Sequence, residues 1–217
     1  MTSTEIIGTG GKMQLPEGKF RCIVADPPWP YNGPRGTWKG DNRKAVGLPY
    51  QTMNMDEIKG LPVGGMATND AHLWLWTTNA FLEDGFDVLR AWGFKYLAPI
   101  HWIKPAGCGS WFVHRTQTIL FGYRERCRFP LARYKPNLFT SSNPARHSEK
   151  PEAAFTLIES VSPGPRLELF ARRNRPGWTV WGNEVNQDAP AGNQGAEPVQ
   201  RLTAAGQNTG DTLELDL

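Results

Sequence analysis

The chain has 217 residues, 3 cysteines and a formal net charge of +3 at pH 7, which permits nucleic-acid binding without requiring it. This length predicts one domain, and no stretch is long and apolar enough to cross a bilayer. The cysteines lack any CxxC pairing and the first residues lack a secretory signal, which argues against a zinc site and favours reduced thiols in the cytoplasm.

Residues 1–17 are polar and contain several glycines, and we predict a flexible N-terminal arm there. The apolar run of residues 20–25 then predicts a buried strand. It ends directly before the Asp-Pro-Pro-Trp turn of residues 26–29. Because ligands of open α/β sheets bind beyond the carboxyl ends of the strands, this turn is predicted to stand at the mouth of an active site. The turn is stiff, since each proline fixes φ at about −65° and lacks an amide hydrogen.

The Asp-Pro-Pro-Trp turn suits one chemical task, which is to hold an exocyclic amino group on a flat ring. Asp26 offers a carboxylate oxygen, Pro27 a backbone carbonyl, and Trp29 a face on which a base can stack. Two acceptors aimed at the two hydrogens can draw the amino nitrogen toward a tetrahedral geometry. The alternative interpretation is a proline-stiffened turn after a core strand, with Asp26 as a cap.

The next segment, residues 30–47, is rich in Gly, Pro, Asn and basic side chains. A loop of this length in a compact domain is typically functional or disordered. We expect a lid that orders over substrate, and plain disorder is the alternative. Asn54 is then predicted to cap a short helix that begins at Met55.

Residues 72–77 predict a second strand, which is almost continuously apolar, as expected for a sheet covered on both faces. A helix is predicted from residue 79 to Gly93, and its sheet-facing side chains are expected to be Leu82, Phe86, Leu89 and Trp92. Further strands are predicted over residues 96–103 and 118–123, with a glycine-bearing loop over residues 107–114 between them.

A basic cluster follows the last of these strands. It consists of Arg124, Arg126, Arg128, Arg133 and Lys135, with aromatic residues among them. Basic side chains with interleaved aromatics suit a nucleic-acid backbone and unstacked bases. A solvated hairpin is the alternative interpretation.

The C-terminal part predicts one more helix and two strands. The helix opens over residues 147–151, where Lys150 lies beside free backbone amides. Residues 166–172 predict a strand that presents three alternating side chains on one face, namely Glu168, Phe170 and Arg172. Residues 178–181 predict the last strand, and residues 186–217 predict a disordered tail.

Four blocks of this sequence together resemble the DPPW-type adenine-N6 methyltransferases, the MT-A70 (MTA-seventy) family that includes the eukaryotic mRNA adenosine methyltransferase. These blocks are residues 20–29, 48–62, 146–172 and 178–185. The resemblance implies a three-layer, Rossmann-like α/β fold over residues 18–185, with a mostly parallel, seven-stranded sheet and the circularly permuted, β-class order of motifs. The implied reaction is direct transfer of a methyl group from S-adenosylmethionine to the N6 of an adenine, without a metal.

The resemblance also implies a role for individual residues. The implied catalytic residues are Asp26, Pro27, Pro28 and Trp29. The implied substrate-binding residues are Tyr31, Tyr50 and Lys104, with Tyr50 as a second wall of the base pocket or, alternatively, as a residue that packs the loop. The implied donor-binding residues are Asp26, Lys150, Glu168, Phe170, Arg172, Asn183 and Glu184. Among these, Lys150 is expected at the donor carboxylate, Glu168 at the ribose and Phe170 at the adenine.

Two positions depart from the pattern of the family. The acidic-apolar pair that holds the donor's adenine upstream of the turn has no clear equivalent, and Ile6 and Ile7 are the nearest candidates. Gln117 stands where relatives often carry an acidic residue, and its role stays open.

The polymer that carries the adenine is a further question. DNA is favoured because short stand-alone relatives look bacterial or phage-borne, which also implies the cytoplasm of a bacterium or of a phage-infected host. RNA is the close alternative. A non-catalytic nucleic-acid-binding subunit, or methylation of a cytosine N4 or a protein amide, are rival interpretations. Because little sequence remains for a recognition domain, we expect relaxed or very short sequence specificity, or a homodimer.

Overall fold

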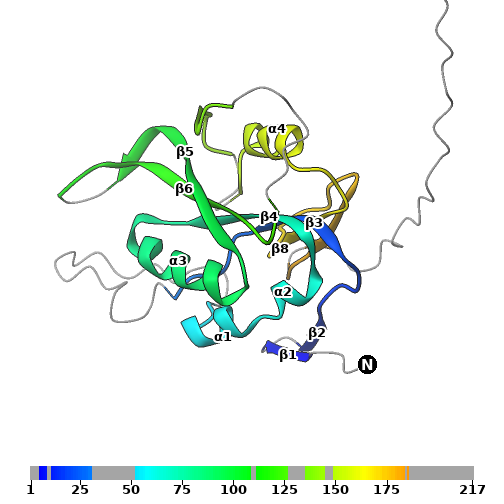
Figure 1. Ribbon diagram of the computed structural model, residues 1–217. Coiled ribbons are helices and arrows are strands. Elements are labelled where there is room, and N and C mark those ends of the chain that lie inside the picture. The colour runs from blue at the N-terminus through cyan, green and yellow to red at the C-terminus, as the bar shows by residue number, and fades with distance from the viewer. Residues whose placement is uncertain are drawn as a thin grey trace, which may run out of the picture.

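The chain is built around a seven-stranded sheet with the strand order β7-β5-β6-β4-β3-β8-β9 (Figure 1). The computed structural model describes residues 5–8, 11–30, 52–108, 111–126, 135–144, 149–183 and 185. The strands of the sheet are β3 (Phe20–Ala25), β4 (Ala67–Thr77), β5 (Lys95–Cys108), β6 (His114–Tyr123), β7 (Leu138–Thr140), β8 (Arg166–Leu169) and β9 (Trp178–Trp181). The pairs β3–β4, β3–β8, β8–β9 and β5–β7 are parallel, whereas β4–β6 and β5–β6 are antiparallel. The mostly parallel, seven-stranded sheet is therefore confirmed.

Helices cover both faces of this sheet (Figure 1). One face carries α1 (Met55–Gly60), α2 (Val63–Met66), the 3-10 turn η1 (Asn79–Phe81) and α3 (Leu82–Ala91), and the other carries α4 (Glu152–Val161). In β4, Leu73 and Leu75 belong to the core under α3, whereas Trp74 and Trp76 belong to the core under α4. Successive side chains of a strand point to opposite faces, so this apolar stretch fills both cores and produces the three-layer architecture.

The short helix α1 begins where the sequence predicts. The Asn54 side chain accepts a hydrogen bond from Glu57 N at 2.9 Å, and the Glu57 side chain accepts one from Asn54 N at 2.7 Å. This reciprocal capping box satisfies two backbone donors at the start of the helix. Trp92 Nε1 then donates to the Ile58 carbonyl at 2.9 Å and ties α1 to the end of α3.

The structure corrects two predictions, one about the buried face of a helix and one about the length of a strand. Leu82 does not face the sheet but is 36% exposed, because the η1 turn directs Phe81, which is 2% exposed, into the core instead. The strand predicted over residues 166–172 ends at Leu169. It ends there because Phe170 adopts a φ of 63°, which lies in the left-handed region and breaks the extended conformation.

Other elements differ in extent. The arm predicted over residues 1–17 contains an antiparallel hairpin of β1 (Glu5–Gly8) and β2 (Gly11–Gln14). The loop predicted over residues 107–114 is shorter than expected, because β5 and β6 remain paired as far as Cys108 and His114. The tail and almost all of the predicted lid lie outside the described residues. None of the described helices is long and apolar enough to cross a membrane.

Candidate active site

The carboxyl ends of three parallel strands meet at one edge of the sheet. Ala25, the last residue of β3, lies opposite Leu169, the last residue of β8, and Leu169 lies opposite Trp181, the last residue of β9. Asp26 and Phe170 are the next residues along the chain after β3 and β8. Because parallel strands end at the same side, residues that are 144 positions apart in sequence become neighbours at this edge.

A cleft opens at this edge, between the strand ends and the start of α4. Its empty volume, counted together with the part open to solvent, is about 400 Å³. Its lining includes Trp76, Phe155 and Phe170, and its charged side chains are Asp26, Glu149, Lys150, Glu168, Arg172, Arg173 and Arg175. A concave site that combines aromatic walls with converging polar groups is the usual form of a small-molecule binding site.

Asp26 and Lys150 form an ion pair inside this cleft. Lys150 Nζ donates to Asp26 Oδ2 at 2.5 Å, and the side chains are only 9% (Lys150) and 23% (Asp26) exposed. The same ammonium lies 5.1 Å from the centroid of the Trp76 ring. The contact leaves Asp26 Oδ1 as the carboxylate oxygen that Lys150 does not engage. Lys150 therefore orients the Asp26 carboxylate, in addition to lining the cleft where the sequence predicts a donor carboxylate.

The backbone of the Asp-Pro-Pro-Trp turn is held by its own hydrogen bonds. Trp29 N donates to the Pro27 carbonyl at 2.8 Å, and Met53 N donates to the Pro28 carbonyl at 2.9 Å. A carbonyl oxygen has two lone pairs, so the Pro27 carbonyl keeps one acceptor position for a substrate. The turn is thus rigid in the way that its two prolines predict.

The prediction that Trp29 offers an open stacking face is wrong. Its side chain is 2% exposed, and its ring stacks on Phe81 with centroids 5.6 Å apart and planes 12° apart. Phe81 reaches this position from the 3-10 turn after β4. Trp29 therefore anchors the turn in the core below α3, and base stacking requires another aromatic side chain.

Glu168 is the titratable group most perturbed by its surroundings in this cleft. Burial raises the pKa of Glu168 to about 7, while the Arg175 guanidinium acts in the opposite direction and Asp26 adds to the rise. Arg175 Nε lies 3.8 Å from Glu168 Oε2, yet neither atom has a hydrogen-bond partner among the described residues. A buried carboxylate oxygen without a donor can accept a hydroxyl group of a ligand.

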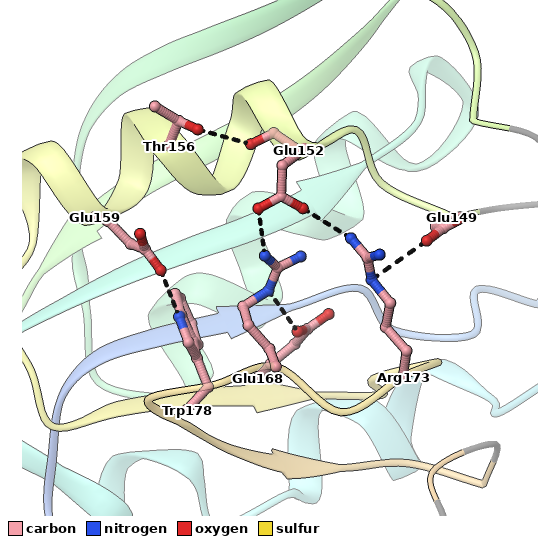
Figure 2. Close-up of polar contacts among 8 residues, drawn as sticks. Glu149, Glu152, Thr156, Glu159, Glu168, Arg173 and Trp178 are labelled. Atoms are coloured by element: carbon pink, nitrogen blue, oxygen red, sulfur yellow. Dashed lines mark hydrogen bonds and ion pairs between the residues drawn. The ribbon is translucent and has the colours of Figure 1, made fainter.

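Arg175 is a site residue that sequence reasoning missed. Its side chain is 8% exposed, its guanidinium carbon lies 3.4 Å from the centroid of the Phe155 ring, and its Nη1 donates to Glu152 at 2.6 Å. Arg173 contacts Glu152 at 2.8 Å and Glu149 at 3.3 Å, and Figure 2 shows Glu152 reaching from α4 toward this segment after β8. The sequence signal for this residue is the group of arginines at 172, 173 and 175, of which the resemblance implies a role for Arg172 alone.

A sequence profile of the MT-A70 family matches residues 20–184, from the start of β3 to the segment just after β9. The chain belongs to the MT-A70 family. Among MT-A70 relatives, the chain is 29% identical over 187 residues to the Type II methyltransferase M.MunI of Mycoplasma sp, and the alignment covers 79% of this chain and 80% of that protein. The cleft therefore belongs to a member of a family of methyltransferases.

Other MT-A70 relatives are much longer proteins. The probable N(6)-adenosine-methyltransferase MT-A70-like of Oryza sativa subsp. japonica is 31% identical over 182 residues, which cover 78% of this chain and 23% of that protein. The N(6)-adenosine-methyltransferase catalytic subunit METTL3 of Homo sapiens is 27% identical over 190 residues, which cover 78% of this chain and 29% of that protein. The chain thus spans about a quarter of the length of these two relatives.

Most of the donor-binding residues implied by the MT-A70 resemblance lie together. The cleft brings together Asp26, Lys150, Glu168, Phe170 and Arg172. Asn183 is exposed just beyond β9 and is not part of the cleft lining. Lys104 lies on β5, away from this lining, with its Nζ 4.6 Å from the centroid of the Trp102 ring. The predicted site residues outside the described part of the chain are Tyr31, Tyr50, Glu184, Arg128 and Arg133.

The described members of the basic cluster have different surroundings. Arg124 Nη1 donates to the backbone carbonyls of Gly64 at 2.8 Å and Ala67 at 3.1 Å, so this guanidinium holds the start of β4 in place. Arg126 and Lys135 are exposed. The structure therefore assigns Arg124 an internal contact and leaves Arg126 and Lys135 accessible to a polyanion.

Proposed function

We propose that this chain transfers the methyl group of S-adenosylmethionine to the N6 amino group of an adenine in DNA. One observation carries the proposal. The Asp26 carboxylate, oriented by Lys150, opens on the same cleft as Glu168 and Phe170. An acceptor for an amino group and a set of side chains suited to a nucleoside-like donor therefore share one cavity.

The donor half of the cleft fits S-adenosylmethionine through residues of this chain. Glu168 Oε2 has no hydrogen-bond donor among the residues that the structure describes, so a ribose hydroxyl group has an acceptor there. Phe170 lies two residues farther along the chain, beside this carboxylate, where its ring can contact the adenine. S-adenosylmethionine supplies an electrophilic methyl group on a sulfonium. Lys150 and Arg172 add positive charge for its carboxylate.

The acceptor half uses the rigid turn. Lys150 engages Asp26 Oδ2, so Oδ1 and the second lone pair of the Pro27 carbonyl are the acceptors for the two amino hydrogens. These two hydrogen bonds withdraw the nitrogen lone pair from the ring and direct it at the methyl group. Positioning and electrostatics account for the rate in this scheme, without a covalent intermediate.

Similarity to the Type II methyltransferase of Mycoplasma supports DNA over RNA as the polymer. The alignment covers 80% of that methyltransferase, whereas the alignments with the two N(6)-adenosine-methyltransferases cover 23% and 29% of those proteins. A paired adenine hides its N6 in the stack, so the substrate is single-stranded or the base is flipped out at a cost of a few kcal/mol.

Nucleoside analysis tests the proposal. The purified chain is incubated with S-adenosylmethionine and either DNA or RNA, and the digested polymer is examined by mass spectrometry. We expect N6-methyldeoxyadenosine. Appearance of N6-methyladenosine in RNA alone would reverse the choice of polymer. Absence of methylation in both, together with no calorimetric binding of S-adenosylmethionine, would favour a non-catalytic subunit.

Asp26→Ala tests the role of Asp26 in the same methylation assay. It removes the acceptor without touching Glu168, Phe170 or Arg172, so we expect loss of methyl transfer with donor binding largely retained. Turnover by Asp26→Ala at the wild-type rate would contradict the assignment of Asp26.

A further inference from the structure

The β5–β6 hairpin extends beyond the sheet on the side of the active site. β4 ends at Thr77, which lies opposite Thr118 of β6. Pairing between β5 and β6 continues past this point through Ile103 and Thr116 to Cys108 and His114. Because β4 is parallel to β3, this extension leaves the sheet at the edge where Asp26 stands. Figure 1 shows β5 and β6 in green, running out beyond the other strands.

Three consecutive apolar side chains lie at the end of this hairpin. Trp111 is 91% exposed, Phe112 is 77% exposed and Val113 is 64% exposed, and we refer to them as the hairpin tip. Contiguous exposed apolar side chains of this size usually mark a contact surface. Trp29 is buried against Phe81, so the hairpin tip supplies the accessible aromatic faces that the Asp-Pro-Pro-Trp turn does not.

Two basic side chains lie close to the hairpin tip. Lys104 is on β5 and Arg115 is on β6, whereas Lys95, Arg124 and Arg126 lie at the opposite end of these two strands. Arg115 is exposed next to the tip, and its Nε donates to the Lys104 carbonyl across the hairpin at 3.1 Å. Flat apolar side chains flanked by cations fit a polyanion with exposed rings.

We propose that Trp111 and Phe112 stack on unpaired bases of the nucleic-acid strand that carries the target adenine, with Lys104 and Arg115 at the adjacent phosphates. This inference rests on the proposed function and names the surface by which the substrate is held. An adenine that enters the Asp26 cleft must leave its stack, and its neighbours lose a stacking partner. The hairpin tip provides replacement stacking faces at the same edge of the sheet.

A binding measurement tests this role directly. The affinity of the chain for a fluorescein-labelled, single-stranded 20-mer with one adenine is measured by anisotropy, without S-adenosylmethionine. Base–aromatic stacking contributes about 1–3 kcal/mol per base, so Trp111→Ala/Phe112→Ala is expected to raise Kd about tenfold or more. Leu97→Ala is the matched control, because Leu97 is an apolar residue 47% exposed near the other end of β5, and its Kd should equal the wild-type value.

Two further double variants separate stacking from apolar contact. Trp111→Tyr/Phe112→Tyr keeps two aromatic faces and should bind within about threefold of wild type, whereas Trp111→Leu/Phe112→Leu should bind as weakly as the alanine variant. Calorimetric binding of S-adenosylmethionine should be unchanged in all of them, which shows that the fold is intact. Recovery of binding by the leucine variant would overturn stacking.

Unchanged oligonucleotide affinity in the alanine variant would overturn the proposal. A second result would also overturn it. If sedimentation shows a wild-type dimer, and the alanine variant is a monomer with unchanged affinity for the oligonucleotide, the tip joins two copies of the chain. Anisotropy is independent of turnover. If the wild type lacks methyl transfer but binds the oligonucleotide through the tip, only the proposed function is refuted. If the wild type is active and the alanine variant binds the oligonucleotide with unchanged affinity, only this inference is refuted.

Discussion

Asp26→Asn is a sharper test of the catalytic turn than removal of the side chain. Asparagine keeps the shape of Asp26 and retains one oxygen. Lys150 Nζ has only hydrogen-bond donors and lies 2.5 Å from Asp26 Oδ2. The amide oxygen of the variant must therefore face Lys150, which turns the NH2 group toward the substrate amino group. Two donors then meet where the native enzyme pairs a donor with an acceptor.

The size of the effect follows from the contact that is lost. A hydrogen bond to a charged group contributes about 1.5–3 kcal/mol, and the facing donors add a repulsive contact. Loss of one preorganised group that stabilises a transition state typically lowers kcat about 10²–10³-fold. We therefore expect kcat to fall by about 10²–10³ in Asp26→Asn, with little change in the Kd for S-adenosylmethionine.

The assay is steady-state methyl transfer to an adenine-containing oligonucleotide at saturating donor, with donor binding followed by calorimetry. The double variant Asp26→Asn/Lys150→Met releases the amide oxygen from lysine, so it can turn toward the substrate. We expect this double variant to recover about tenfold in kcat over Asp26→Asn. Lys150→Met alone is the control. A kcat for Asp26→Asn within about threefold of wild type, or strictly additive losses in the double variant, would refute the reasoning.

Three further predictions concern buried polar groups. Burial raises the pKa of Glu168 from the usual 4.5 to about 7, so the folded state holds this proton at a higher pH than the unfolded state does. The free energy of unfolding should therefore fall as pH rises from about 4.5 to about 7. Glu168→Gln should reduce this pH dependence, as measured by urea titrations at pH 5 and pH 8. Arg175→Met removes a neighbouring positive charge, so the pH at which this slope levels off should move higher, as the same titrations would show. Ser162→Ala should lower the free energy of unfolding by about 2–4 kcal/mol in urea, because Ser162 Oγ is the partner of His72 Nδ1 at 2.8 Å and Trp74 Nε1 at 2.9 Å; a loss below about 1 kcal/mol would contradict this.

Most of the local structure follows from residues that are close in sequence. Asn54 and Glu57 cap α1 as predicted, since a capping box needs only four consecutive residues. The apolar run before Asp26 forms β3, and the turn lies at the carboxyl edge of the sheet. The helix that starts with η1 shows the limit of such reasoning. Its periodicity favours Leu82 inside, but the preceding 3-10 turn shifts the phase and buries Phe81.

The candidate site was only partly accessible from sequence for a related reason. The resemblance to a family implies donor contacts for Glu168, Phe170 and Lys150, and the structure brings these residues into one cleft. Arg175 has no such motif, and its importance comes from burial against Phe155. Burial of a charged side chain depends on what packs over it, which the local pattern of polar and apolar residues does not encode.

Local sequence accounts for most strands of the sheet, for the capping box of α1 and for the stiff acidic turn, because each depends on backbone preferences and side-chain alternation over a few residues. What these parts contact depends on the tertiary structure. Lys150 meets Asp26 across 124 positions, and Trp29 is covered by Phe81 from another strand end. The tertiary structure also extended the β5–β6 hairpin past the sheet and exposed Trp111 beside the active-site edge. These contacts arise from strand order and packing between distant segments, and no short window of the sequence contains both partners.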